Sequence, residues 1–164
     1  MYFRRIFILL LLSSVFVNCD RDDICTEDTP KTPLMIVKFF DAENPGTPKS
    51  VNNFSLVLDG EDYLLFDPVS TDSIGIPLQT FQDYTHYIFV NNYTDSLYNY
   101  DKIFFTYTRT DQYISRACGF RTNFSQLQAA LQTPTEGSWI EFVEIISDSI
   151  NILRPNDTHL HIYH

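Results

Sequence analysis

Two histidines near the C-terminus have the spacing of metal ligands on a strand. His159 and His161 lie at positions i and i+2, so a strand would place both imidazoles on one face, where they could bind zinc or copper. No third ligand is identifiable, and the plainer interpretation is an exposed strand face. The acidic turn Asp59-Gly60-Glu61-Asp62 offers oxygen ligands for calcium but lacks the ligand series of a known calcium loop. We therefore expect no metal and no cofactor, and the two histidines are only weak metal candidates.

Tyrosines are concentrated in one segment between two expected strands. Residues 91–101 contain Tyr93, Tyr98 and Tyr100 among asparagines and aspartates. Tyrosine supplies a large contact face with a polar tip, which suits loops that bind sugars or proteins. The segment is therefore a candidate binding loop. The alternative is a long hairpin loop whose tyrosines pack locally.

Sequence motifs of the common enzyme classes are missing. The five glycines are too far apart for a Gly-x-Gly phosphate loop, and neither Gly-x-Ser-x-Gly nor His-Glu-x-x-His occurs. The formal charge of −10 and the pI near 4.6 argue against a nucleic-acid partner, because an acidic chain repels phosphate backbones. We therefore expect a protein that is not an enzyme. A metal-dependent hydrolase built on His159 and His161 is the remaining enzymatic hypothesis.

The N-terminal segment has the pattern of a secretory signal. Arg4 and Arg5 precede the apolar run 6–17, which has about half of the roughly 20 residues that a membrane-spanning helix needs. We interpret residues 1–18 as a lipoprotein signal peptide. Its removal takes away two arginines and no acidic residue, so the formal charge changes from −10 to −12.

The three cysteines are predicted to have two different roles. Cys19 follows the apolar run and looks like the lipid-attachment site of a bacterial lipoprotein, although Phe16 and Asn18 stand where an aliphatic and a small residue are usual. Ordinary secretion and an uncleaved anchor are the alternatives. If Cys19 carries lipid, an oxidising compartment favours a disulfide between Cys25 and Cys118. The alternative is two separately buried free thiols.

The chain after the signal is predicted to be one β domain. Residues 19–33 are polar and proline-containing, which indicates the anchor and an extended leash. Across residues 34–164 apolar residues recur at period two, which favours an immunoglobulin-like or related antiparallel β-sandwich of about 8–10 strands, with a closed β-barrel as runner-up. Segment 124–132 fits a helix or a strand, and we favour the strand. Turns are expected at Asp59-Gly60, with a returning strand over 63–66, and at Thr110-Asp111, while Pro77 suggests a sheet edge.

Several short motifs are familiar in combination. They are residues 21–25 (RDDIC), 29–33 (TPKTP), 113–120 (YISRACGF) and the closing strand 159–164. With these motifs the chain resembles a family of small lipoproteins from Bacteroidota with a domain of unknown function. The resemblance implies export to the cell envelope as an outer-membrane lipoprotein, with the membrane face undetermined, and it supplies no activity. Three Asp-Ser-aliphatic triplets, at 72–74, 95–97 and 148–150, resemble the O-glycosylation acceptor of exported proteins from the same bacteria.

These features predict a lipid-anchored, non-enzymatic envelope protein that acts as an interaction or structural module. The membrane is one expected partner, through the lipid anchor, and an envelope protein or a glycan is another. The alternative is a glycan or small-ligand binding module that uses the tyrosine-rich loop 91–101.

Overall fold

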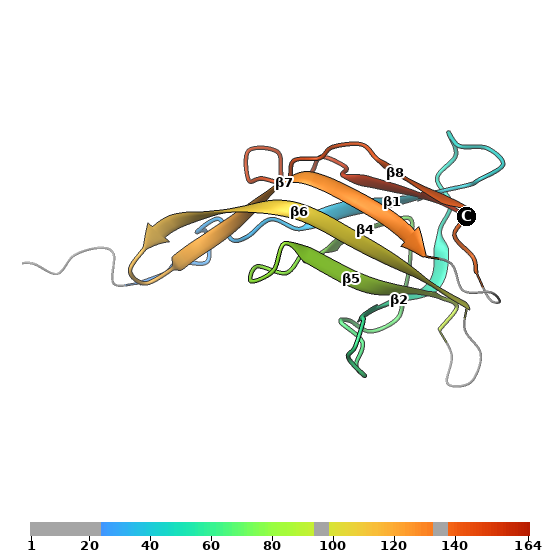
Figure 1. Ribbon diagram of the computed structural model, residues 1–164, viewed down its shortest axis with the longest axis horizontal. Helices are drawn as coiled ribbons and strands as arrows, with labels where there is room; N and C mark the ends of the chain where they lie inside the picture. The colour runs from blue at the N-terminus through green and yellow to red at the C-terminus, as the bar shows by residue number, and fades with distance from the viewer. Residues whose placement is uncertain (1–23, 94–98, 133–137) are drawn as a thin grey trace, which may run out of the picture.

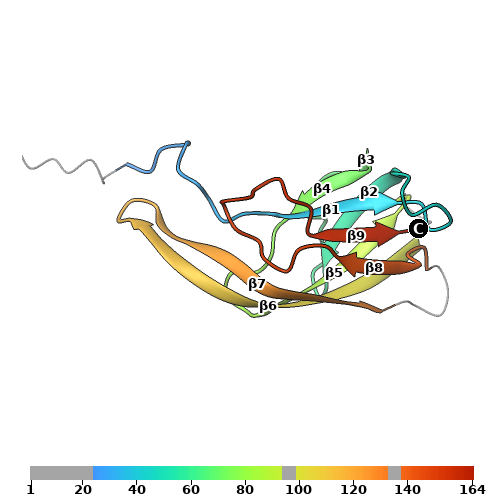
Figure 2. The same cartoon turned by 90° about the horizontal axis from the view of Figure 1, so that it is seen from above.

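Two β-sheets pack face to face and form a sandwich (Figures 1 and 2). The computed structural model describes residues 24–93, 99–132 and 138–164. Within these ranges there are nine strands: β1 (Met35–Phe40), β2 (Val51–Leu58), β3 (Val69–Thr71), β4 (Ser73–Ile76), β5 (Tyr84–Asn91), β6 (Asn99–Ser115), β7 (Gly119–Gln132), β8 (Phe142–Ile145) and β9 (Leu160–Tyr163). This arrangement confirms the predicted all-β sandwich. In the described part of the chain no helix is long and apolar enough to cross a membrane.

The four-stranded sheet joins the first and last strands of the domain. Its order is β4-β1-β9-β8, and the five-stranded sheet has the order β3-β2-β5-β6-β7. The strand pairs are antiparallel, as expected, except that β9 pairs with β1 in parallel, because the first and last strands lie side by side and run the same way. Strand β4 is an edge strand and Pro77 follows it directly, which fits the predicted edge position of this proline.

The core lies between the sheets and is rich in aromatic rings. In β1 and β5 alternate residues are buried in the core, as the period-two pattern predicts. Phe39 of β1 contacts Phe54 of β2 across the sandwich with ring centroids 5.2 Å apart, and Phe54 lies 5.7 Å from Phe89 of β5. The largest fully buried side chains come from both sheets and the connecting segments: Phe39, Phe54, Phe89, Phe105, Phe124, Met35, Leu56, Ile76, Ile103, Ile150, Leu160 and Ile162.

One buried carboxylate fixes the segment that leads into β8. Asp101 of β6 is fully buried, and its Oδ2 accepts hydrogen bonds from the backbone N–H groups of Trp139 (2.8 Å) and Ile140 (2.9 Å). The indole N–H of Trp139 donates to the Phe89 carbonyl at 3.0 Å. Hydrogen bonds to a charged acceptor are stronger than neutral ones, so Asp101 holds this segment against the five-stranded sheet.

Strands β6 and β7 form a long hairpin that extends beyond the sandwich (Figure 1). Residues 124–132 belong to β7, so the strand prediction for this segment is confirmed. The predicted turn at Thr110-Asp111 is wrong, because these residues pair with Asn123 and Thr122 inside the hairpin. On β6 the residues from Thr110 to Tyr113 are all exposed, so polar residues do not end the strand. The predicted returning strand 63–66 is reduced to one bridge between Val57 and Leu64.

Candidate functional site

A disulfide connects the leash to the turn of the long hairpin. Cys25 and Cys118 are bonded, with their Cα atoms 4.9 Å apart. The backbone N–H of Cys118 donates to Ser115 Oγ at 3.1 Å, and Gly119 follows with a φ of 69°, which closes the turn. The structure therefore contains the disulfide that the cysteine parity predicts. The lipid-attachment residue Cys19 lies outside the described residues.

The leash continues along the hairpin after the disulfide. Residues 24–33 form no regular strand or helix. Thr29 Oγ1 lies 3.7 Å from Cys118 Sγ, and Thr32 Oγ1 accepts a hydrogen bond from the backbone N–H of Thr122 at 3.1 Å. The leash and the hairpin are therefore joined by one covalent bond and by non-covalent contacts around it.

The base of the candidate tyrosine loop is fixed by neighbouring backbone. Asn92 adopts a left-handed φ of 56°, and its N–H donates to the Asn52 carbonyl at 2.8 Å. The N–H of Tyr93 donates to the carbonyl of Asn53, which itself has a φ of 42°, at 3.0 Å. Strand β6 begins at Asn99, so Tyr100 lies within this strand. Tyr98 and residues 94–97 lie outside the described residues, and binding by this loop stays a prediction.

The two C-terminal histidines occupy different environments. His159 is 1% exposed, and its Nδ1 accepts the backbone N–H of Ile36 at 2.9 Å, so it contributes to the packing of β1 against β9. The plainer interpretation of an exposed strand face is therefore wrong for His159. His161 is half-buried on β9, with its ring 4.5 Å from that of Phe40. Burial lowers the pKa of both imidazoles.

No cluster of metal ligands surrounds these histidines or the acidic turn. Among residues 24–93, 99–132 and 138–164, no group of three or more His, Cys, Asp or Glu side chains could hold a metal ion. In the acidic turn, Asp59 forms an ion pair with Lys102 of β6 at 2.9 Å. Ser73 and Ser149, the serines of two Asp-Ser-aliphatic triplets, are exposed, and the third triplet lies outside the described residues. Their glycosylation stays a prediction.

An aromatic platform covers part of the outer face of the five-stranded sheet. We define it as Tyr84 and His86 of β5 with Phe104 of β6. His86 and Phe104 are cross-strand neighbours with ring centroids 3.7 Å apart, and Tyr84 lies 5.2 Å from His86. The rings of Tyr84 and Phe104 are nearly parallel, at 6°, with centroids 6.2 Å apart. His86 is tilted by 40° to Tyr84 and by 45° to Phe104, and Tyr84 is 47% exposed, so part of this aromatic group is accessible to solvent.

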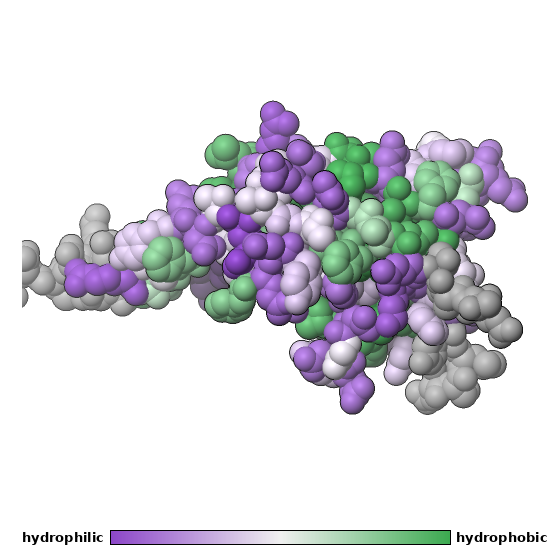
Figure 3. All heavy atoms as spheres, in the orientation of Figure 1, coloured by the Kyte–Doolittle hydropathy of each residue, from purple (hydrophilic) through white to green (hydrophobic). Residues whose placement is uncertain are grey.

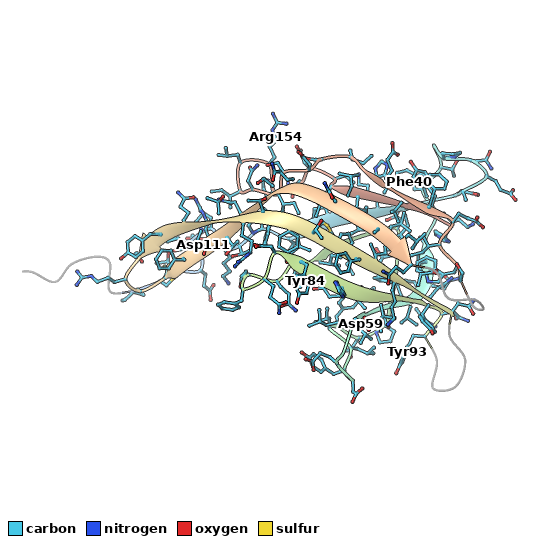
Figure 4. The ribbon with its side chains drawn as sticks, in the orientation of Figure 1. Phe40, Asp59, Tyr84, Tyr93, Asp111 and Arg154 are labelled. Carbon is cyan, nitrogen blue, oxygen red and sulfur yellow. A yellow bond between two sulfur atoms is a disulfide. The ribbon has the colours of Figure 1, made fainter. Side chains whose placement is uncertain are left out.

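A polar cleft borders the platform. Its volume is about 350 Å³, and it is lined by carboxylates and amides as well as by two platform residues: Asp59, Glu61, Gln79, Gln82, Tyr84 and His86. Asp59 and Tyr84, labelled in Figure 4, both line this cleft. Partial burial lowers the pKa of His86, against the opposing effect of Asp59, so a neutral imidazole is favoured there. Exposed aromatic rings beside acceptor oxygens can contact a sugar through its C–H groups and its hydroxyl groups together.

Sequence reasoning missed this platform. Tyr84 and His86 are two residues apart, and Phe104 alternates with the buried Ile103 and Phe105, so the spacing does place all three on outward faces. Aromatic residues are common in strands, and the register that brings β5 and β6 together is a tertiary property. The platform could have been predicted from the sequence only by assuming that β5 pairs with β6 in this register.

Comparison with known proteins gives a family without an activity. A family model described as "Family of unknown function (DUF6452)" matches residues 52–164, which is more than half of the chain. The matched range includes the platform, the long hairpin and Cys118, and it begins after Cys25. No curated protein and no solved structure matches the chain. The chain belongs to the family of unknown function DUF6452.

Proposed function

We propose that this protein is a lipid-anchored, non-enzymatic interaction or structural module of the bacterial cell envelope. Cys19 carries the lipid, and the folded domain displays its surface to other envelope components. The observation that carries the proposal is the Cys25–Cys118 disulfide, because such bonds persist in exported proteins and this one begins six positions after Cys19. The apolar run 6–17 that ends just before Cys19 supports the same interpretation.

Membrane fractionation of two variants tests the anchor. The full chain is expressed in a bacterium as wild type, as Cys19→Ala, and as Cys25→Ser with Cys118→Ser, and membranes are washed with high salt. We expect the wild type and the disulfide variant to stay with the membranes, since both keep the attachment residue, and Cys19→Ala to be released. Equal release of the wild type and Cys19→Ala would contradict the proposal.

Crosslinking in intact cells tests the role as an interaction module. A membrane-bound interaction module should yield the same crosslinked envelope partner in repeated purifications, and Cys19→Ala should lose it. Wild-type protein that is membrane-bound but never crosslinks to a reproducible partner would count against an interaction role.

A neutral-glycan binding module is a second candidate function, and the aromatic platform with its polar cleft favours it. The cleft is lined by Asp59 and Glu61 in a chain of net charge −10, so a neutral sugar fits better than an anionic one. A glycan array compares the wild type with Tyr84→Ala, and Tyr113→Ala serves as the control because Tyr113 is similarly exposed but lies outside the platform. We expect signal for the wild type and the control, and loss for Tyr84→Ala. No signal for the wild type would exclude this function.

A further inference from the structure

Exposed apolar side chains gather at the disulfide-bonded turn of the β6–β7 hairpin. Ile24, beside Cys25, is 77% exposed, Phe120 is 66% exposed and Tyr113 is 54% exposed. Tyr113 and Phe120 are cross-strand partners whose ring centroids lie 5.4 Å apart, so they form one aromatic pair. Single exposed apolar residues are ordinary on soluble domains, but a group of three at one tip needs an explanation.

Basic side chains lie beside this apolar group. Arg116 is in the hairpin turn, and Lys31 and Arg121 line a cleft of about 270 Å³ next to the disulfide and Phe120. Glu27 and Asp28 of the leash lie in the same region of the chain, so the end is mixed in charge, in a protein of net charge −10. Figure 3 shows hydrophobic and hydrophilic side chains interspersed over this narrow end of the molecule. Aromatic rings together with Lys and Arg are typical of protein surfaces at the level of lipid headgroups.

The disulfide sets how far this end can lie from the lipid. Cys19 precedes Cys25 by six positions, and six residues span at most about 20 Å. Strand β1 begins sixteen positions after Cys19, which would allow about 55 Å. The Cα atoms of Cys25 and Cys118 are 4.9 Å apart, so the bond brings the hairpin turn within about 25 Å of the lipid attachment residue.

We propose that this cross-linked end, defined as Ile24, Tyr113, Arg116, Phe120 and the Cys25–Cys118 disulfide, contacts the headgroup region of the bilayer. The inference rests on the proposed lipid anchor at Cys19. The C-terminus lies at the opposite end of the long axis in Figure 1, so the C-terminal end of the sandwich points away from the membrane. The hairpin then acts as a spacer that sets the orientation of the domain on the lipid surface.

Quenching of tryptophan by brominated lipids tests the contact. The lipidated full chain is reconstituted into phosphatidylcholine–phosphatidylglycerol vesicles with and without bromine on the acyl chains. One variant carries Phe120→Trp and the matched control carries Phe81→Trp, since Phe81 is 91% exposed. In the loop that contains Phe81, Thr80 and Asp83 bind Arg109 of β6. Arg109 lies six residues before the end of β6, so it is about 20 Å from the hairpin turn, and this loop is equally remote from it. The native Trp139 is present in both proteins and serves as an internal reference.

We expect brominated vesicles to quench the Phe120→Trp probe at least twofold more than the Phe81→Trp control. Adding Cys25→Ser and Cys118→Ser should reduce the quenching of the Phe120→Trp probe to the level of the control, because the tether becomes longer. Protein that floats with the vesicles but shows no extra quenching would overturn the inference and leave the lipid anchor intact. The same result combined with a crosslink from position 120 to an envelope protein would assign this end to a protein partner instead. Protein that carries no lipid and does not float would refute the proposed function and this inference with it.

Discussion

Replacing Cys25 and Cys118 by serine removes the covalent bond between the leash and the hairpin. The two cysteines are 93 positions apart, and closing a loop of this length in the unfolded chain is worth about 4.7 kcal/mol in the chain-entropy relation. The non-covalent contacts between leash and hairpin, among them the hydrogen bond from the backbone N–H of Thr122 to Thr32 Oγ1, would remain. A domain of this size has a free energy of unfolding of about 5–15 kcal/mol, so the loss is a large fraction of its stability.

Urea unfolding followed by Trp139 fluorescence measures this loss. Trp139 is half-buried and its indole N–H bonds to the Phe89 carbonyl, so its emission should report the packing of the sandwich. With a urea dependence of about 2 kcal/mol per M, a loss of 4.7 kcal/mol lowers the midpoint by about 2.4 M.

Two comparisons make the disulfide prediction refutable. Wild-type protein in reducing agent should unfold at the same urea concentration as the double serine variant, because the loop-closure effect does not depend on the side chains. A loss under about 1 kcal/mol in both would refute the reasoning. A loss in the serine variant alone would place the effect in the substitutions and not in the bond.

Three further outcomes follow from buried and strained groups. Asp101→Ala should lower the free energy of unfolding by about 3 kcal/mol, since two backbone N–H groups lose their carboxylate acceptor. A loss no greater than that of Asp67→Ala, at an exposed position, would contradict this. Gly119→Ala should lower the free energy of unfolding by about 1 kcal/mol, because Gly119 has a φ of 69°. Gly46→Ala should have almost no effect, because Gly46 is also in open space but has no positive φ. Equal losses for the two variants in urea unfolding would show that the backbone of Gly119 is unstrained. Burial lowers the pKa of His159, His161 and His164, so the native state binds fewer protons than the unfolded chain below the ordinary pKa of 6.5. The free energy of unfolding should therefore stay constant above that pH and decline as the pH falls below it. Urea midpoints at several pH values measure this decline. His159→Asn should make the decline smaller if His159 contributes to it.

The period-two pattern predicts the strands that line the core. Along β1, Met35, Val37 and Phe39 are buried and alternate with more exposed residues, and Leu160 and Ile162 of β9 are both fully buried. Burial of one face imposes this alternation, which is why the pattern is readable without a structure.

The pattern fails where the chain leaves the sandwich. From Thr110 to Tyr113 strand β6 is exposed at every position, so Thr110 and Asp111 carry no sign of the pairing that continues through them. The parallel pairing of β1 with β9 is a long-range choice that local sequence does not record. The aromatic platform was missed for the same reason, because its rings meet only through the register of β5 and β6.

Intact mass spectrometry of the protein purified from membranes, before and after reduction, tests the central claim most directly. The account predicts a chain that begins at Cys19, carries the added mass of a lipid, and gains two hydrogen atoms when the Cys25–Cys118 bond is reduced. A mature chain with unmodified Cys19, or one that begins elsewhere, would contradict the anchor. A mass that does not change on reduction would contradict the disulfide that ties the leash to the hairpin.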